Sequence, residues 1–494
     1  MKRLIAFLLF FYPLYSALGG SWKWDSDLSE SYQQVFRLQF NAAQLKLSSV
    51  TQHDQNNIHV QYLNCKIDFL KAFISEEDTE YQKFKRNKER FDAMIESSVE
   101  ADGYKGYYLA DVNLFSAILR FKRGETVGAA IEFRKSYKLL EKNEARFPEF
   151  IPHKLSLGFL HSVIGAVPEN YKWIVRVAGF KGSIKQGLME IQSASLKIKS
   201  ESSLSYLKQD AEMMYLLVKY FLDNDVKTSA ALINKLGEDE SSPLMVFIAC
   251  SFYNAHGKSA STISLLDRND NLFDKEYYPM YYLQLQKASA YLYKLDKRSV
   301  DHYTYYVTHY KGNSFVKAAY QRLAWSSAIV NDTVGFYKYM AQIKNRGSTF
   351  TDEDKQSQKE SINPIFPNVY LLRARLLFDG GYYLKAQKEL SQPIQNFPTN
   401  KDQIELVYRM ARIKDKQGET ERAVEYYSRT YEIGKSKTYY FAANAALQLG
   451  LLYENKGEYK KAKAWFLKCL ELRDHEYQNS IDQKAEAGLN RIDS

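Results

Sequence analysis

The chain has 494 residues, with 68 Lys and Arg against 58 Asp and Glu and a formal net charge of +10. Hydrophobic residues make up 45% and charged residues 26% of it, which excludes a disordered tail, a polytopic membrane protein and a collagen-like fibre. Its 23 glycines and 10 prolines fall below the usual shares of about 7% and 5%, so the composition predicts a mostly helical chain.

The first nineteen residues have the pattern of a secretory signal peptide. The basic pair Lys2-Arg3 precedes an apolar run over 4–14, and the triplet Ala17-Leu18-Gly19 provides a small-x-small cleavage site. The run is shorter than a membrane-spanning helix, which needs about 20 apolar residues. The cleavage site also lacks the nearby cysteine that a bacterial lipoprotein would have. We therefore expect cleavage after residue 19 and export to the periplasm or the outer membrane of a bacterial cell envelope.

The charge of the mature chain argues against a nucleic-acid partner. Without the signal, 66 basic residues face 58 acidic ones, a net charge of +8 with no long block of Lys or Arg. No later segment reaches transmembrane length, so we expect any membrane association to come through a partner.

Segments 20–145 and 146–200 differ in the prolines and glycines that interrupt their helical pattern. The first predicts helical hairpins, and its clearest unit, 111–142, carries in order Ala117, Gly124, Ala129, Phe133 and Tyr137. The second is a helical segment interrupted by prolines at positions 148, 152 and 168 and by the glycines of Gly179-Phe180-Lys181-Gly182 and Gly187-Leu188. His153 and His161 lie in this segment, and the sequence pattern gives them no acidic partner.

Segment 201–345 predicts degenerate hairpins. One unit, 244–270, contains Cys250, Tyr253, Gly257 and Leu266. Two further stretches, 281–295 and 315–330, have helical length but no glycine between helices, and the second ends at the turn signal Asn331-Asp332. Segment 346–366 is polar and charged, and we expect it to form a long loop or hinge.

Segment 367–494 shows the clearest internal repetition. Ala386, Ala423 and Ala462 lie at equivalent places, 37 and 39 residues apart, and Gly381, Gly418 and Gly457 precede them. Small residues let two antiparallel helices cross closely, and each glycine supplies the left-handed residue that ends the first helix. Pro398 then stops a second helix.

These offsets resemble the tetratricopeptide repeat (TPR), a helix-turn-helix unit of about 34 residues. The resemblance implies an all-α fold, a right-handed superhelical solenoid of TPR-like hairpins, with the extra residues in the loops between repeats. The Gly-Phe-Lys-Gly and Gly-Leu stretch also resembles one in a mitochondrial TPR family implicated in inclusion-body clearance, and this likeness supports the all-helical array.

No group of residues predicts catalysis or a metal site. Gly257-Lys258-Ser259 resembles the end of a phosphate-binding loop, but Phe252 stands where that motif needs a glycine. His302 and His309 are about 10 Å apart along a helix, too far to share an ion. The three cysteines, Cys65, Cys250 and Cys469, sit in apolar helical patterns and predict small buried side chains rather than disulfides. We expect no cofactor and no enzymatic activity.

Tyrosines between positions 277 and 310 leave an alternative open. Ten tyrosines fall in this stretch, and tyrosine packs between helices but also stacks on sugars. The alternative function is a glycan-binding surface protein similar to the SusD-like nutrient receptors. Against it stand the missing lipoprotein cysteine and only five tryptophans.

The TPR resemblance implies where a protein or peptide partner would bind. First helices of such repeats line a concave face, and positions two, five, nine and twelve of each repeat point outward from it. These positions hold Asn368, Leu371, Arg375 and Phe378 in one unit, Tyr408, Arg412 and Asp415, with Glu405, in the next, and Asn444, Leu447 and Leu451, with Glu454, in the last. We therefore expect a non-enzymatic scaffold or adaptor that binds a protein or peptide partner.

Overall fold

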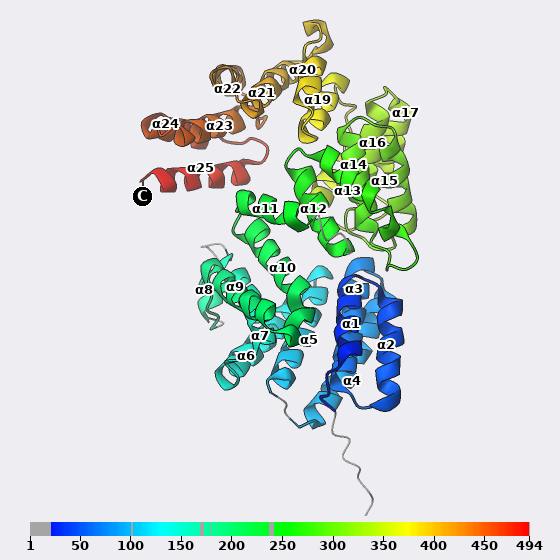
Figure 1. The fold of residues 1–494 in the computed structure, drawn as a ribbon. Coiled ribbons are helices and arrows are strands. Elements are labelled where there is room, and N and C mark those ends of the chain that lie inside the picture. Colours follow the sequence, from blue (N-terminus) through cyan, green and yellow to red (C-terminus); the bar gives the residue numbers. More distant parts are fainter. Residues whose placement is uncertain (1–20, 100–101, 168–171, 178, 237–241, 494) are drawn as a thin grey trace, which may run out of the picture. The chain divides into compact units, whose positions relative to one another are not determined.

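The computed structural model describes residues 21–99, 102–167, 172–177, 179–236 and 242–493 (Figure 1). The expected signal peptide, residues 1–19, lies outside the described residues. The described residues fall into two compact units, one within Met1–Ala249 and Arg268–Met280 and the other within Cys250–Asp267 and Tyr281–Ser494. All regular elements among them are helices, which confirms the predicted all-α fold class, and one isolated bridge pairs Ser21 with Asn57.

The first unit is built from helices that pack on their neighbours in the chain. Its elements are α1 Ser26–Phe36, α2 Phe40–His53, α3 Ile58–Ser75, α4 Asp78–Ser97, α5 Tyr104–Lys122, α6 Thr126–Arg146, α7 Ile151–Gly165, α8 Lys172–Val177, α9 Ile184–Ser200, η2 Ser202–Leu207, α10 Lys208–Leu217, η3 Val218–Leu222, α11 Val226–Leu236 and η4 Asp270–Phe273. The closest pairs are α1 with α2, α3 with α4, α5 with α6, and α7 with α9. The pair α5–α6 is the predicted unit 111–142, with Gly124 in the left-handed conformation at its turn.

An aromatic core holds the first described residues of this unit in place. Trp22 Nε1 donates to the Val99 carbonyl over 2.8 Å, and Asn57 Nδ2 donates to the Lys23 carbonyl over 2.9 Å. The Trp24 ring stacks on Tyr206 with centroids 4.4 Å apart. Residues 21–25 are therefore part of the folded unit, although they precede its first helix.

Buried charges in the same core are paired. Lys66 Nζ lies 3.0 Å from Asp210 Oδ1 and donates to Tyr32 Oη over 2.6 Å. Asp111 accepts hydrogen bonds from Tyr62 and Ser156, at 2.9 and 2.7 Å, and burial raises its pKa. A buried charge is tolerated only when it is paired or hydrogen-bonded, so these contacts allow the charged side chains to lie inside the core.

Glycines allow α7 and α9 to cross closely. A Cβ atom on Gly187 would collide with the Gly158 carbonyl oxygen and with Ser162 Oγ. The Phe180 ring packs edge-on against Tyr137, and the Tyr137 hydroxyl bonds to the backbone of Lys181 at 3.1 Å. The glycine-rich segment thus contributes to packing: Gly187 lets α9 lie close to α7, and Phe180 and Lys181 contact Tyr137 of α6.

The second unit continues the pairwise packing. Its elements are α13 Ser259–Arg268, α14 Tyr281–Tyr293, α15 Arg298–His309, α16 Val316–Ala328, α17 Thr333–Gln342, α18 Asp352–Glu360, α19 Val369–Asp379, α20 Tyr383–Leu390, η5 Ile394–Asn396, α21 Asn400–Lys416, α22 Thr420–Gly434, α23 Phe441–Asn455, α24 Tyr459–Glu471 and α25 Gln478–Asp493, and α12 Pro243–Ala255 precedes them. The closest pairs are α14–α15, α16–α17, α19–α20, α21–α22 and α23–α24. This arrangement of successive hairpins confirms the expected TPR-like helical solenoid.

The turns between paired helices follow the predicted chemistry. Gly381, Gly418 and Gly457 have φ of +86°, +77° and +74°, in the left-handed region that glycine adopts without strain. Where no glycine was present in the sequence, Leu295 and Asn331 take φ of +60° and +61°. The predicted turn at Asn331-Asp332 is present, and Asp332 also caps α17 by accepting from the Gly335 amide over 2.8 Å.

Segment 346–366 is not the continuous loop that its polarity predicted, because it contains the helix α18. Thr351 caps α18 at its N-terminus. The buried Asp354 side chain accepts from the backbone amides of Phe315 and Ala318, at 2.6 and 3.0 Å. A carboxylate there satisfies the free amides of the first turn of α16, so a helix without an apolar stripe is anchored through hydrogen bonds.

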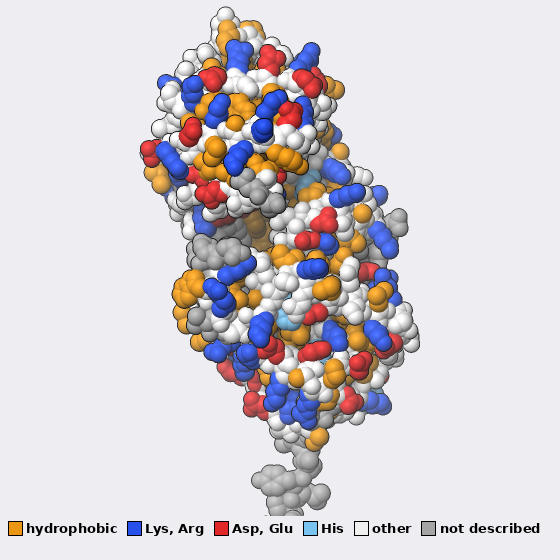
Figure 2. Space-filling model, turned by 90° about the vertical axis from the view of Figure 1, so that its left-hand side faces the viewer, with side chains coloured by type: hydrophobic (Ala, Val, Ile, Leu, Met, Phe, Trp, Pro, Cys, Tyr) orange, Lys and Arg blue, Asp and Glu red, His pale blue; other side chains and the backbone are white. Residues whose placement is uncertain are grey.

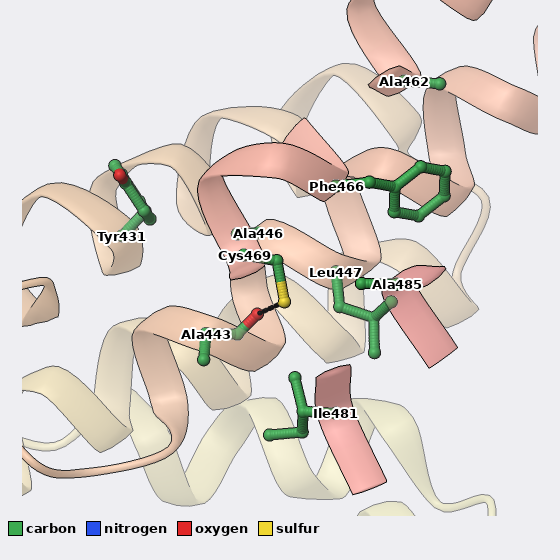
Figure 3. Packing of buried hydrophobic residues seen from close by; sticks show 9 residues of the cluster. All are labelled: Tyr431, Ala443, Ala446, Leu447, Ala462, Phe466, Cys469, Ile481 and Ala485. Carbon is green, nitrogen blue, oxygen red and sulfur yellow. Dashed lines mark hydrogen bonds between the residues drawn. The ribbon is translucent and has the colours of Figure 1, made fainter. Parts of the chain in front are cut away.

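The three C-terminal hairpins pack around small residues. Ala386, Ala423 and Ala462 have no exposed surface, as the repeat offsets predicted. In the last cluster Phe466 fills the space left by Gly450 and Gly488, and Cys469 Sγ lies 3.3 Å from the Ala443 carbonyl (Figure 3). Cys65, Cys250 and Cys469 are all buried and unpaired with one another, as expected.

The final helix covers the last hairpin. Ile481 and Ala485 of α25 are buried against α23 and α24, and Arg491 forms a two-point ion pair with Glu454 at 2.7 and 2.8 Å. Among the described helices, none combines the length and apolarity that crossing a bilayer requires.

Replacing Gly187 by alanine should lower the free energy of unfolding by about 1–3 kcal/mol, because the added Cβ forces α7 and α9 apart. Urea unfolding followed by circular dichroism measures this loss. Ser193→Ala, at an exposed position of α9, is the control and should change stability by less than about 0.5 kcal/mol. Equal unfolding midpoints for Gly187→Ala and the natural chain would contradict the close crossing.

Stability of the first unit should fall on acidification through His59. Its Nδ1 lies 2.7 Å from Tyr108 Oη, and burial lowers its pKa from 6.5 to about 4. Between these pH values the imidazole is protonated in the unfolded chain but stays neutral in the folded one. The free energy of unfolding is therefore highest above pH 6.5 and falls by about 3 kcal/mol as the pH is lowered toward 4. Urea unfolding at several pH values should show a shallower pH dependence for His59→Gln, and identical slopes would contradict this assignment.

Candidate functional site

The first helices of the three C-terminal hairpins, α19, α21 and α23, carry all the predicted partner-binding positions except Asn368, which immediately precedes α19. These helices contact one another directly, α19 with α21 and α21 with α23. We use "inner face" for the side of these helices that carries Arg375, Arg409, Arg412 and Tyr440.

Four predicted positions are part of the core. Leu371, Tyr408 and Leu447 are 3%, 3% and 1% exposed, and Phe378 is 9% exposed. Each packs against the neighbouring hairpin in a hydrophobic cluster. The expectation that these side chains face a ligand is therefore wrong for the free chain, because the adjacent inner helix covers them.

Asn368 is the N-cap of α19. Its Oδ1 accepts from the amides of Tyr370 and Leu371, at 3.1 and 3.3 Å, and its Nδ2 donates to the Asn396 carbonyl over 2.7 Å. All of its hydrogen-bonding groups thus serve the fold. The offset of position two places it at the helix start, where an asparagine has a capping role.

The other predicted positions are partly exposed. Asn444 accepts from the Tyr408 hydroxyl over 3.1 Å, and Asp415 accepts from the Tyr427 hydroxyl over 3.3 Å. Burial raises the pKa of Asp415. Leu451 packs at the edge of the last cluster. The side chains of Asn444 and Asp415 thus have hydrogen-bond partners within the fold. Arg375 and Arg412 are the predicted polar residues that have none among the described residues.

Arg375 and Arg412 occupy equivalent positions of consecutive repeats, 37 residues apart. The Arg375 guanidinium lies 4.1 Å from the Trp325 ring centroid, and that of Arg412 lies 4.2 Å from the Phe378 ring centroid. Each arginine is thus stacked on an aromatic ring of the preceding hairpin, an attraction worth about 0.5–2 kcal/mol. Among the described residues, neither guanidinium has an ion-pair or hydrogen-bond partner, and Arg375 Nη2 is buried.

Charged neighbours surround Arg375. Burial and the charge of Arg409 lower its pKa, while the carboxylates of Asp379, Glu405 and Glu360 act in the opposite direction. Glu405 is engaged by Arg409, whose Nε donates to it over 2.7 Å. Glu360 accepts from Gln321 and Gln356.

Two tyrosines border this cluster. Tyr440 and Tyr477 meet edge to face with centroids 5.4 Å apart, and Tyr477 is 52% exposed. Burial raises the pKa of Tyr477 to about 12, and the charge of Arg375 acts to lower it, so the hydroxyl lies within electrostatic range of that arginine. Acidic and basic side chains are interspersed on the molecular face drawn in Figure 2.

Five residues at or around the inner face were not predicted from the sequence: Trp325, Glu360, Arg409, Tyr440 and Tyr477. Trp325 belongs to α16, a hairpin without the repeat's glycine, and Glu360 belongs to the helix predicted as a loop. Tyr440 and Tyr477 precede the helices α23 and α25. The recurrence of arginine at one repeat offset was the signal that pointed here.

Half of the tyrosines in the stretch 277–310 are buried. Tyr282, Tyr291, Tyr303, Tyr306 and Tyr310 are buried. Tyr305 is 43% exposed, stacked on His309 at 4.1 Å and tilted against Tyr281 at 6.3 Å. The interhelical role of tyrosine therefore accounts for half of the stretch.

Both histidines of the interrupted segment have acidic partners, contrary to the sequence expectation. His153 Nε2 contacts Glu144, and His161 Nδ1 lies 2.6 Å from Glu190 Oε2. Glu190 lies on α9 and is brought to His161 of α7 by the glycine-mediated crossing. No group of three or more metal-ligating side chains converges within the described part of the chain.

The comparisons with known proteins agree with this geometry at the C-terminus. A model of the tetratricopeptide repeat matches residues 443–475, which include α24 and most of α23. No match to a curated protein was found. The chain therefore contains a tetratricopeptide repeat within an all-helical fold, and repeats of this kind present extended surfaces to other proteins.

Replacing Asn368 by alanine should destabilise the second unit by about 1–2 kcal/mol, because two amides of α19 lose their cap. Asn368→Asp retains the accepting oxygen and should recover most of the loss. Thermal unfolding followed by circular dichroism distinguishes the two variants. An alanine variant with an unchanged melting temperature would show that the cap is not needed.

Proposed function

We propose that the protein is a non-enzymatic, exported scaffold or adaptor that binds a protein or peptide partner in the cell envelope on its inner face. One observation carries this proposal. Arg375 and Arg412 are held in place by aromatic rings at equivalent positions of consecutive repeats, and neither has an ion-pair or hydrogen-bond partner among the described residues.

The composition of the inner face supports a protein ligand. Arginine and tyrosine are enriched at the energetic centres of protein interfaces, and Tyr477 supplies an exposed aromatic surface beside Tyr440. Aromatic stacking restricts both guanidiniums before binding, which reduces the entropy lost when a ligand docks.

The ionisable clusters of the first unit favour a structural role over catalysis. Lys66 is committed to Asp210 and Tyr32, and Asp111 to Tyr62 and Ser156. A general acid or base needs access to a substrate proton, and these groups are instead bonded to one another inside the core. Export rests on the N-terminal sequence pattern alone.

The glycan-binding alternative rests on the exposed Tyr305 with its neighbours Tyr281 and His309. Lost binding to a glycan array in Tyr305→Ala would favour it. The pair of unpartnered arginines favours the protein ligand.

Site-specific photocrosslinking in the native host tests the proposal. A benzophenone amino acid at Tyr477, beside the inner face, should give a discrete adduct with one envelope protein. The matched control is Tyr459, which is 57% exposed at the start of α24. The adduct should be absent at Tyr459. Identical adducts from both positions, or none from Tyr477, would contradict binding at the inner face.

A further inference from the structure

We propose that the inner face recognises an acidic, extended peptide segment, whose carboxylate side chains bind the guanidiniums of Arg375 and Arg412. This inference rests on the proposed function and adds the chemistry of the partner. It begins from the two arginines that the fold positions but does not neutralise.

An aromatic ring lies beside each guanidinium. The guanidinium carbon of Arg375 lies over the Trp325 ring and that of Arg412 over the Phe378 ring, at 4.1 and 4.2 Å from the ring centroids. The N–H groups of a guanidinium lie in its plane, and one of the nitrogens that carry them, Arg375 Nη2, is buried in the free chain. A carboxylate is the ligand whose two oxygens match this planar fork.

The nearest carboxylates of the chain are already engaged. Glu405 is bound by Arg409 on the same helix, and Glu360 accepts from Gln321 and Gln356. Arg375 Nη2 therefore stays buried without an acceptor in the described residues. A buried donor without an acceptor is unfavourable, and a peptide carboxylate reaches this nitrogen only if the side chains that cover it move aside.

The arrangement favours side-chain carboxylates over a single C-terminal carboxylate. Two arginines on neighbouring inner helices need two acceptors, and adjacent helix axes lie about 8–10 Å apart. An extended chain advances about 3.3 Å per residue, so acidic residues two to four positions apart span this distance.

The mixed charge of the face favours a peptide over a nucleic acid. Asp379 lies one helical turn from Arg375, and Glu405 lies near it. A phosphate backbone, with a charge on every unit, would meet these carboxylates as well as the arginines. A peptide with spaced acidic residues and neutral ones between them avoids that repulsion.

Fluorescence anisotropy with labelled, C-terminally amidated twelve-residue peptides tests the inference. The probes carry two Glu three positions apart in a Gly/Ser/Ala background, or Gln at the same places. The full-length mature protein should bind the Glu peptide at least about tenfold more tightly than the Gln peptide at low salt, and added salt should reduce the difference. An amidated probe is required because it removes the terminal carboxylate.

Charge reversal identifies the arginines. Arg412→Glu, at a partly exposed residue without an ion-pair partner among the described residues, should weaken binding of the Glu peptide by about tenfold or more and improve binding of a Lys peptide of the same design. Lys388→Glu on α20 is the matched control and should leave both affinities unchanged. Arg375→Lys keeps the charge without the planar fork and should give an intermediate affinity.

Equal affinities for the Glu and Gln peptides would overturn the inference, as would equal effects of Arg412→Glu and Lys388→Glu. Tighter binding of a single-stranded oligonucleotide than of the Glu peptide would overturn it in favour of phosphate recognition. A Tyr477 crosslink that persists in Arg412→Glu would overturn the acidic-segment inference while leaving the proposed function in place.

Discussion

Close crossing of two helices, made possible by a small residue on each, is the constraint on which the second unit depends. A single hairpin cannot bury its apolar side, and a large residue at the crossing would hold the helices apart. Ala386, Ala423 and Ala462 occupy these places with no exposed surface, and Phe466 fills the gap beside Gly450. Because the three C-terminal hairpins carry these alanines at equivalent places, equivalent residues recur on one side of them. The unpartnered arginines at one repeat offset follow from this regularity.

The first unit meets the same requirement by other means. Its closest crossing, between α7 and α9, uses Gly158 and Gly187 in place of alanines. The residues between its helices include buried tyrosines, a lysine and two aspartates, which must be satisfied internally. The Lys66–Asp210 pair and the hydrogen bonds of Asp111 supply such partners, while Asp210 Oδ2 has none among the described residues. The unit therefore has a polar core whose ionisable groups are bonded to one another.

The sequence predicted local features that depend on one or two residues. The left-handed glycines, the buried alanines and the turn at Asn331-Asp332 are set by the chain nearby, and the structure confirms them. Residues 346–366 were wrongly predicted as a loop because α18 is held by hydrogen bonds to α16 and not by an apolar stripe. The candidate site was only partly predictable for the same reason. A repeat offset gives the side of a helix but not what covers it, so Leu371 and Leu447 proved to be core, and Trp325 entered from a hairpin with no recognisable glycine.

Hydrogen–deuterium exchange on the complex of the natural chain with the envelope partner that crosslinking identifies would test the central claim most directly, because it reports the bound surface without altering a residue. The account predicts slower exchange on binding in peptides from α19, α21 and the loop that contains Tyr477. Peptides from the second helices α20, α22 and α24 should exchange as they do in the free protein. Protection confined to those second helices, or to the first unit, would contradict a ligand on the inner face.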